Sequence, residues 1–178
     1  MKKIVLSIVF ICANLFAFGQ VGENFPEVTV TDLNDKEEVI PKDTKGKFTL
    51  IGVAFSEDAQ RDLYSWSEPV YNEFMNENNF ASLVYDPHVK LILMFGGGNQ
   101  LVYNKAKEQI LEGTDESLRN NVVLYKGEVK TYRKSLKMKD RKIPYFFVLD
   151  KKGKIIYAAS GKYNKKTLEE VGNLIEDE

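Results

Sequence analysis

The sequence predicts an α/β fold in which a central mixed β-sheet is flanked by helices. Nearly continuous apolar runs rich in β-branched and aromatic residues are typical of buried strands, and apolar residues three and four positions apart are typical of helices. In chain order these segments predict strand, helix, strand, helix, strand, strand, helix. This alternation indicates a layered α/β domain. No repeat or Pro/Gly-rich linker divides it, so we expect a single domain.

The first 19 residues have the layout of a cleaved secretory signal. Two lysines precede an apolar run from Ile4 to Ile11, and small residues stand at Ala17 and Gly19. A membrane helix needs about 20 apolar residues, so this run is too short to span a bilayer. We expect residues 1–19 to be removed, residues 20–178 to form one domain without a transmembrane segment, and the protein to be periplasmic or secreted.

Cys12 is the one cysteine of the chain, and it lies inside this expected signal. The mature protein would then contain no cysteine and no disulfide, so its stability would come from an ordinary hydrophobic core. The alternative is that Cys12 is a lipid-attachment residue. The bulky side chains of Phe10 and Ile11 before it argue against that alternative, because lipoprotein signals prefer small residues there.

Charge is distributed unevenly along the chain. Residues 20–119 contain 9 basic and 18 acidic side chains, whereas residues 120–178 contain 14 basic and 8 acidic ones. One interpretation is two solvated faces of opposite sign; the other is an anion-facing surface near Lys126 to Lys142. Aromatic platforms are not interleaved with the basic residues, so we expect no nucleic-acid partner.

The first predicted strand runs from Val28 to Leu33, where apolar and polar residues alternate. A short strand at Val39 and Ile40 is expected to run back along it after a polar turn. Phe48 to Phe55 is almost entirely apolar and predicts a central strand covered on both faces.

A helix is predicted directly after this strand. Ser56 can cap it, and its first turn carries carboxylates that suit the helix dipole. Pro69 predicts a kink or a restart, and Ser65 with Glu68 fits a capping box for the second part. The expected buried stripe consists of Leu63, Trp66, Val70 and Phe74.

The remaining chain predicts four strands and three helices. The strands are expected at Lys90 to Phe95, Val122 to Tyr125, Tyr145 to Asp150 and Lys154 to Ser160, the last two forming a hairpin. The helices are expected at Leu101 to Leu111, Glu128 to Met138 and Lys165 to Ile175.

Two stretches resemble the redoxin branch of the thioredoxin superfamily, which includes exported TlpA-like and peroxiredoxin-like proteins. They are GENFPEVTVTDLNDKEEVIPKDTKGKFTLIGVAF near the N-terminus and IPYFFVLDKKGKIIYAASG near the C-terminus. The resemblance implies a thioredoxin-like fold over the whole mature chain. It also implies that Pro144 matches the proline that is usually cis in this family and lies beside the redox site.

The redox motif of that family is missing here. In the family the central strand runs into W-C-x-x-C at the start of a helix, and this chain has FSEDAQRDLYSW instead. Alignment on Phe55 and Pro69 places the two cysteine positions near Gln60 and Leu63. Disulfide exchange and peroxide reduction both need a thiolate, so we expect a degenerate member without redox activity and without a cofactor.

We therefore expect a redox-inactive protein of the cell envelope that binds a protein or peptide partner through the former active-site surface. The side chains expected on this surface are Arg61, Asp62, Tyr64 and Trp66. A purely structural envelope protein is an alternative.

A second alternative is an enzyme that uses carboxylates or the single histidine. Glu57, Asp58 and Asp62 lie within two helical turns, and His88 follows a turn at Asp86 and Pro87. Charge at a helix start is the favoured explanation of the carboxylates, and no loop offers the several oxygen ligands that a hard cation needs, so no metal is expected.

The glycine run Gly96 to Gly98 between a strand and a helix also has two interpretations. It is either a tight turn or a place where backbone N–H groups approach an anion, although it matches no nucleotide-binding motif.

Overall fold

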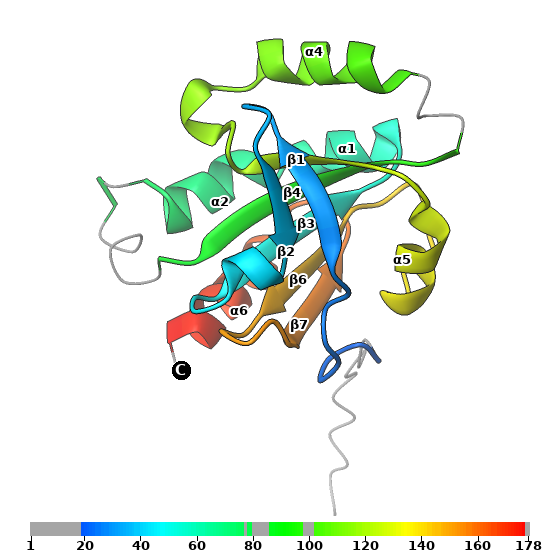
Figure 1. Ribbon diagram of the computed structural model, residues 1–178. Coiled ribbons are helices and arrows are strands. Elements are labelled where there is room, and N and C mark those ends of the chain that lie inside the picture. The colour runs from blue at the N-terminus through cyan, green and yellow to red at the C-terminus, as the bar shows by residue number, and fades with distance from the viewer. Residues whose placement is uncertain (1–18, 77, 80–85, 98–101, 177–178) are drawn as a thin grey trace, which may run out of the picture.

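The computed structural model describes residues 19–76, 78–79, 86–97 and 102–176 (Figure 1). Cys12 and residues 1–18 of the expected signal lie outside these residues. The strands are β1 (Val28–Asp32), β2 (Glu37–Ile40), β3 (Thr49–Ala54), β4 (His88–Phe95), β5 (Val122–Lys126), β6 (Tyr145–Leu149) and β7 (Ile155–Ser160). The helices are α1 (Glu57–Tyr64), α2 (Ser67–Phe74), α4 (Tyr103–Gly113), α5 (Val129–Ser135) and α6 (Lys165–Glu176), with 3₁₀ turns η1 (Lys42–Thr44) and η3 (Glu116–Leu118).

The strands form one mixed sheet in the order β2-β1-β5-β4-β3-β6-β7. The three central strands β3, β4 and β5 are parallel, and their connections carry the helices α1, α2 and α4. The outer strands pair antiparallel with their neighbours. The carboxyl ends of β3, β4 and β5 therefore meet at one edge of the sheet, where ligands bind in many open α/β sheets.

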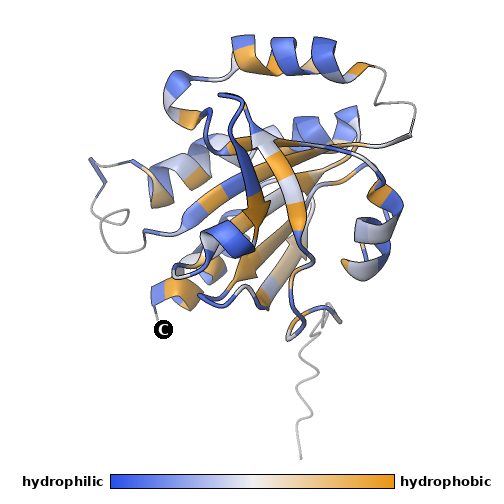
Figure 2. Cartoon of the chain, in the orientation of Figure 1, coloured by the Kyte–Doolittle hydropathy of each residue, from blue (hydrophilic) through white to orange (hydrophobic). Residues whose placement is uncertain are grey.

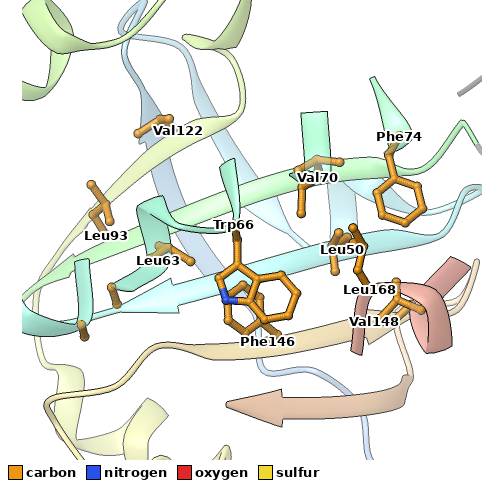
Figure 3. Close-up of a cluster of buried hydrophobic side chains, with 14 of the residues drawn as sticks. Leu50, Leu63, Trp66, Val70, Phe74, Leu93, Val122, Phe146, Val148 and Leu168 are labelled. Carbon is orange, nitrogen blue, oxygen red and sulfur yellow. The ribbon is translucent and has the colours of Figure 1, made fainter. Parts of the chain in front are cut away.

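Each face of the sheet is covered by its own hydrophobic core, because side chains alternate between the faces along every strand. On one face, Leu50, Leu93 and Phe146 pack with residues of α1, α2, α4 and α6. Figure 3 shows part of this core, in which Trp66 lies against Phe146. On the other face, Ile51 and Phe147 pack with α5 and the N-terminal segment. In Figure 2 the central strands are largely apolar, whereas the helices mix apolar and polar residues.

The predicted fold class is confirmed, and every predicted strand and helix is present within a few residues of its expected ends. Ser56 caps α1 as expected, since its Oγ accepts a hydrogen bond from the Ala59 N–H at 3.2 Å. The helix stops at Tyr64 and restarts at Ser67, so the interruption predicted from Pro69 is confirmed as a restart.

Two local predictions are wrong. Ser65 does not cap α2: its Oγ donates to the Asp62 carbonyl at 2.6 Å and accepts from the Tyr163 N–H at 3.0 Å. The helix expected to reach Met138 ends at Ser135. Its continuation is blocked because Lys137 adopts a left-handed backbone conformation with φ of 50°.

The N-terminal segment lies against the edge strand β7. The Gly22 N–H donates to the Ile155 carbonyl at 2.8 Å, and the Ile155 N–H donates to the Glu23 carbonyl at 2.9 Å. At the opposite edge, β2 has only four residues and is followed by Pro41.

Candidate functional site

Helix α1 starts where the sequence predicts, directly after Ser56, but the cysteine positions taken from the alignment lie further along the helix. Helix α1 begins at Glu57, so Gln60 and Leu63 lie in its second turn. The residues at the helix start are Ser56 and Ala59, which have the same spacing of three as the family's cysteines. Ser56 is partly exposed, and its Oγ also donates to the Arg141 carbonyl at 2.5 Å; Ala59 is buried. Ser56 and Ala59 contain no thiol, and neither do Gln60 and Leu63.

Gln60 and Leu63 have different environments. Gln60 is half-buried, and its side-chain amide donates to the Tyr64 hydroxyl at 2.8 Å. Leu63 is fully buried and packs against Gly52 of β3. Leu63 therefore belongs to the core, and only Gln60 can contact a ligand.

The four residues expected on the binding surface do not all lie there. Tyr64 is 44% exposed. Arg61 is exposed and forms an ion pair with Asp58, whereas Asp62 is mostly covered and pairs with Lys162 at 3.5 Å. Trp66 is buried, packs on Phe146 and donates its Nε1–H to the Gly161 carbonyl at 3.0 Å. The assignment of Trp66 to the surface is therefore wrong, and its place in the buried stripe is confirmed.

The expectation of a cis bond at Pro144 is also wrong. Among the described residues the cis X-Pro bond is Ile40–Pro41, so the bond before Pro144 is trans. Pro144 is buried and leads directly into β6, and its carbonyl accepts a hydrogen bond from the Gly161 N–H at 2.9 Å. A trans bond is the ordinary state of such a segment, because no tight turn requires the cis form. Pro144 still lies beside the end of β3, since Tyr145 pairs with Val53.

A cleft of about 780 Å³ opens between α1 and α4 above the carboxyl ends of β3 and β4. Its floor is apolar and includes Ala54, Leu93 and Phe95 from the two strands. Its α1 wall carries Ser56, Glu57, Asp58, Gln60 and Tyr64, and its α4 wall carries Ala106, Gln109, Ile110 and Gly113. We call this space the cleft.

An apolar hollow of about 300 Å³ extends the cleft toward α2. Tyr64, Gly113 and Thr114 border both spaces. The floor of the extension is formed by Val89 and Leu91 of β4. The two spaces together form a groove along β4 between the helices of this face. A groove of this size with an apolar floor is suited to apolar side chains of a ligand.

Two of the large apolar side chains that are exposed lie at this cleft. Tyr64 from α1 and Val102, which precedes α4, are 44% and 53% exposed, and both line it. Of the residues singled out from the sequence, Tyr64 and Gln60 line this cleft. Its α4 wall was missed, since helical periodicity does not show how far apart two separately predicted helices pack.

The carboxylates and the histidine are only partly brought together. Glu57 and Asp58 both line the cleft, but Asp62 pairs with Lys162. His88 starts β4, at the end of the strand opposite to the cleft, where burial and the nearby Lys47 and Lys90 lower its pKa below the ordinary value. Within the described ranges, no group of three or more His, Cys, Asp or Glu side chains is placed to hold a metal ion.

The comparisons with known proteins agree with this architecture. A family model described as ATP10 protein matches residues 20–176. No curated protein matches the chain. In the described part of the chain, no helix is both long enough and apolar enough to cross a membrane.

Several solved structures share the fold. The thioredoxin domain of a thiol-disulfide oxidoreductase from Bacteroides vulgatus has 20% identity and a TM-score of 0.57, with 87% of this chain and 97% of that chain covered. The exposed lipoprotein thioredoxin Etrx1 of Streptococcus pneumoniae has 16% identity and a TM-score of 0.57, with 84% and 99% covered. BsSco, a member of the Sco family of cytochrome c oxidase assembly proteins, has 10% identity and a TM-score of 0.56, with 86% and 92% covered. At these identities the similarity establishes a thioredoxin-like fold.

Proposed function

Because the chain belongs to the ATP10 protein family, and because its thioredoxin-like fold has no cysteine at the former redox site, we propose that it is a redox-inactive assembly factor. It binds a polypeptide partner in the cell envelope through the cleft between α1 and α4. The observation that carries the proposal is the combination of an apolar floor with the exposed side chains of Tyr64 and Val102 at this cleft.

Thiol chemistry has no chemical basis at this site. The helix start carries Ser56, Glu57, Asp58 and Ala59, and none of these side chains attacks sulfur or peroxide oxygen as a thiolate does. Cys12 is the one thiol in the sequence and belongs to the expected signal. The binding surface of the fold is thus retained without its reactive groups.

The cleft has the physical properties of a peptide-binding surface. Aromatic and aliphatic side chains are exposed next to a concave apolar floor. A ligand that removes them from water lowers the free energy, so their burial favours binding. The polar groups of Ser56, Gln60 and Gln109 at the same cleft provide hydrogen bonds that orient a ligand.

The assembly role and the envelope location rest on different observations. The assembly role is supported by the match to the ATP10 protein family, whose model is named after ATP synthase. It is also supported by the similarity to BsSco, which is described as a member of a family of cytochrome c oxidase assembly proteins. The location rests on the signal-like segment of residues 1–19 and is supported by the exposed lipoprotein thioredoxin of Streptococcus pneumoniae.

The test is capture of partners from envelope extract by the full-length protein, followed by quantitative mass spectrometry. Tyr64→Glu places a charge at the apolar cleft and should remove the partner. Val21→Glu is the matched control, because Val21 is 49% exposed and does not line the cleft. A partner that both variants retain would exclude the cleft, and the absence of any reproducible partner would reject the binding function.

A carboxylate enzyme is the second candidate, because Glu57 and Asp58 both line the cleft. Replacing both residues with the corresponding amides preserves their shape and removes their acid–base chemistry. If partner capture persists in Glu57→Gln/Asp58→Asn, the carboxylates are not needed for binding. Turnover of a substrate that the same variant loses would favour the enzyme.

A further inference from the structure

Phe55 borders a second hollow of about 240 Å³ in addition to the cleft. Its lining includes the glycines Gly96 and Gly97 and the charged residues Glu128, Lys130, Arg133 and Arg141. We call this space the basic hollow. It brings together two features that lie far apart in the sequence, the glycine-rich turn after β4 and the basic segment from Lys126 to Lys142.

The glycines keep the hollow open. A Cβ atom at Gly96 would lie 2.6 Å from Cγ2 of Val129, which is closer than real contacts allow. Gly97 has a φ of 56°, a left-handed conformation that side chains disfavour. The short backbone of this turn therefore approaches α5 without filling the space beside its basic residues.

The lining of the basic hollow carries more cations than carboxylates. Its three cations are Lys130, Arg133 and Arg141. None of them takes part in an ion pair within the described part of the chain. The one carboxylate in the lining, Glu128, accepts a hydrogen bond from the Lys130 backbone N–H at 2.7 Å. Three cations beside one carboxylate leave a local excess of positive charge, which attracts anions.

Arg133 is held in place before any ligand arrives. Its Nε donates to the Met138 carbonyl at 3.3 Å, and its Nη2 donates to the Lys139 carbonyl at 3.0 Å. The guanidinium carbon lies 5.2 Å from the centre of the Phe55 ring, which stacks on Tyr145. A guanidinium fixed in this way loses little entropy on binding, and it is the side chain best matched to a planar oxyanion.

The basic hollow and the cleft are joined physically. Phe55 lines both, and Ser56 of the cleft donates its hydroxyl to the backbone carbonyl of Arg141. The two spaces are therefore neighbours at the carboxyl end of β3. The volume of the hollow is that of one side-chain group rather than of an extended surface, which favours a single acidic group over a lipid bilayer.

We propose that the basic hollow binds a carboxylate of the polypeptide whose apolar part occupies the cleft. The identity of this carrier rests on the proposed function, but the affinity of the hollow for a carboxylate does not. Lys130 and Arg141, both exposed, supply mobile charge, and Arg133 supplies the fixed planar donor.

The test uses citrate as the probe and isothermal titration calorimetry on the full-length chain at low ionic strength. We expect one citrate per chain. In Lys130→Glu/Arg141→Glu the affinity should fall about tenfold, since two attractive charges become repulsive. Lys134→Glu/Lys137→Glu is the matched control: it changes the charge equally at exposed positions outside the hollow and should change the affinity by less than about threefold. Circular dichroism verifies the fold of both variants.

Several results would overturn the proposal. The first is no citrate binding by the unaltered chain, and the second is an equal loss of citrate affinity in the two double variants. The third is that the unaltered chain binds phosphatidylglycerol vesicles in preference to citrate and that both double variants lose this vesicle binding equally. The last result would assign the charge to a membrane surface. Tyr64→Glu should bind citrate like the unaltered chain, so failure of the cleft and failure of the basic hollow give different outcomes.

Discussion

Lys90 is a charged residue inside the protein, held by one carboxylate. Its Nζ donates to Glu38 Oε2 at 2.7 Å and to the Asn120 carbonyl at 3.0 Å, and both side chains of the pair are nearly covered. The pair joins β4 to β2. A buried charge whose partner is removed keeps its desolvation cost without compensation.

Glu38→Leu should therefore lower the free energy of unfolding by about 3 kcal/mol, measured by urea denaturation. Lys90→Met/Glu38→Leu should recover most of that loss, because no charge remains buried. As a control, Glu169→Leu removes one partner of the exposed pair with Lys165 and should change the free energy by less than about 1 kcal/mol. Equal effects at Glu38 and Glu169 would show that the Lys90 pair is not buried in solution.

His88 makes stability depend on pH. Burial, together with Lys47 and Lys90, lowers its pKa in the folded protein, while Glu38 and Asp86 oppose this shift. The unfolded chain binds the proton near pH 6.5 and the folded chain only at lower pH, so stability falls as the pH drops through this window. Urea midpoints between pH 7.5 and 5.5 should decline less in His88→Gln, and an equal decline would assign the effect to other groups.

At the scale of elements, α1 is packed on β3 through Gly52 and Leu63. A Cβ atom at Gly52 would lie 2.7 Å from Leu63 Cδ1, 3.0 Å from Leu91 Cδ2 and 3.2 Å from Phe146 Cε1. A glycine in the middle of a strand is explained here by the close approach of the helix.

Gly52→Ala should lower the free energy of unfolding by about 1–3 kcal/mol through overpacking. Gly52→Ala/Leu63→Ala should be less destabilised than the sum of the two single variants, because the second change removes the nearest clash. Gly113→Ala is the control, since a Cβ atom there meets nothing within 4 Å. Additive single effects would show that the two residues do not touch.

The start of α1 determines which positions correspond to the missing cysteines. In a Cys12→Ser background, Ser56→Cys should react with iodoacetamide at pH 7 about tenfold faster than Gln60→Cys, because a helix N-terminus lowers the thiol pKa. Equal rates would favour the assignment from alignment, at Gln60. The sequence alone could not settle this point, because FSEDAQRDLYSW contains no cysteine that would fix the register of the alignment.

At the scale of the whole molecule, the two cores share one sheet. Trp66 is the one tryptophan of the chain and reports on the core under α1, α2 and α6. Its fluorescence and the far-ultraviolet circular dichroism should change at the same urea concentration, because the same strands contribute side chains to both cores. Separate transitions would mean that the helical layer unfolds on its own.

The fold could be predicted from the sequence because apolar runs and helical stripes are local patterns, and each of them forms the expected element. The site could be predicted only in part. Trp66 fits both the buried stripe and the surface, and only packing on Phe146 decides between them. The cleft and the basic hollow depend on how distant segments come together, as Gly96 and Arg133 do, and no local pattern contains that information.

The two ends of the sheet bear on how the protein avoids self-association. Free edge strands offer unpaired N–H and C=O groups to other chains and promote aggregation. Here β2 is short, carries Glu37 and Glu38 and ends directly before Pro41. At the other edge, the backbone groups of Gly22 and Glu23 form hydrogen bonds with those of Ile155 at the start of β7. The segment that follows the expected cleavage point thus covers the start of β7, and a chain trimmed beyond it would leave these backbone groups open to pairing with another chain.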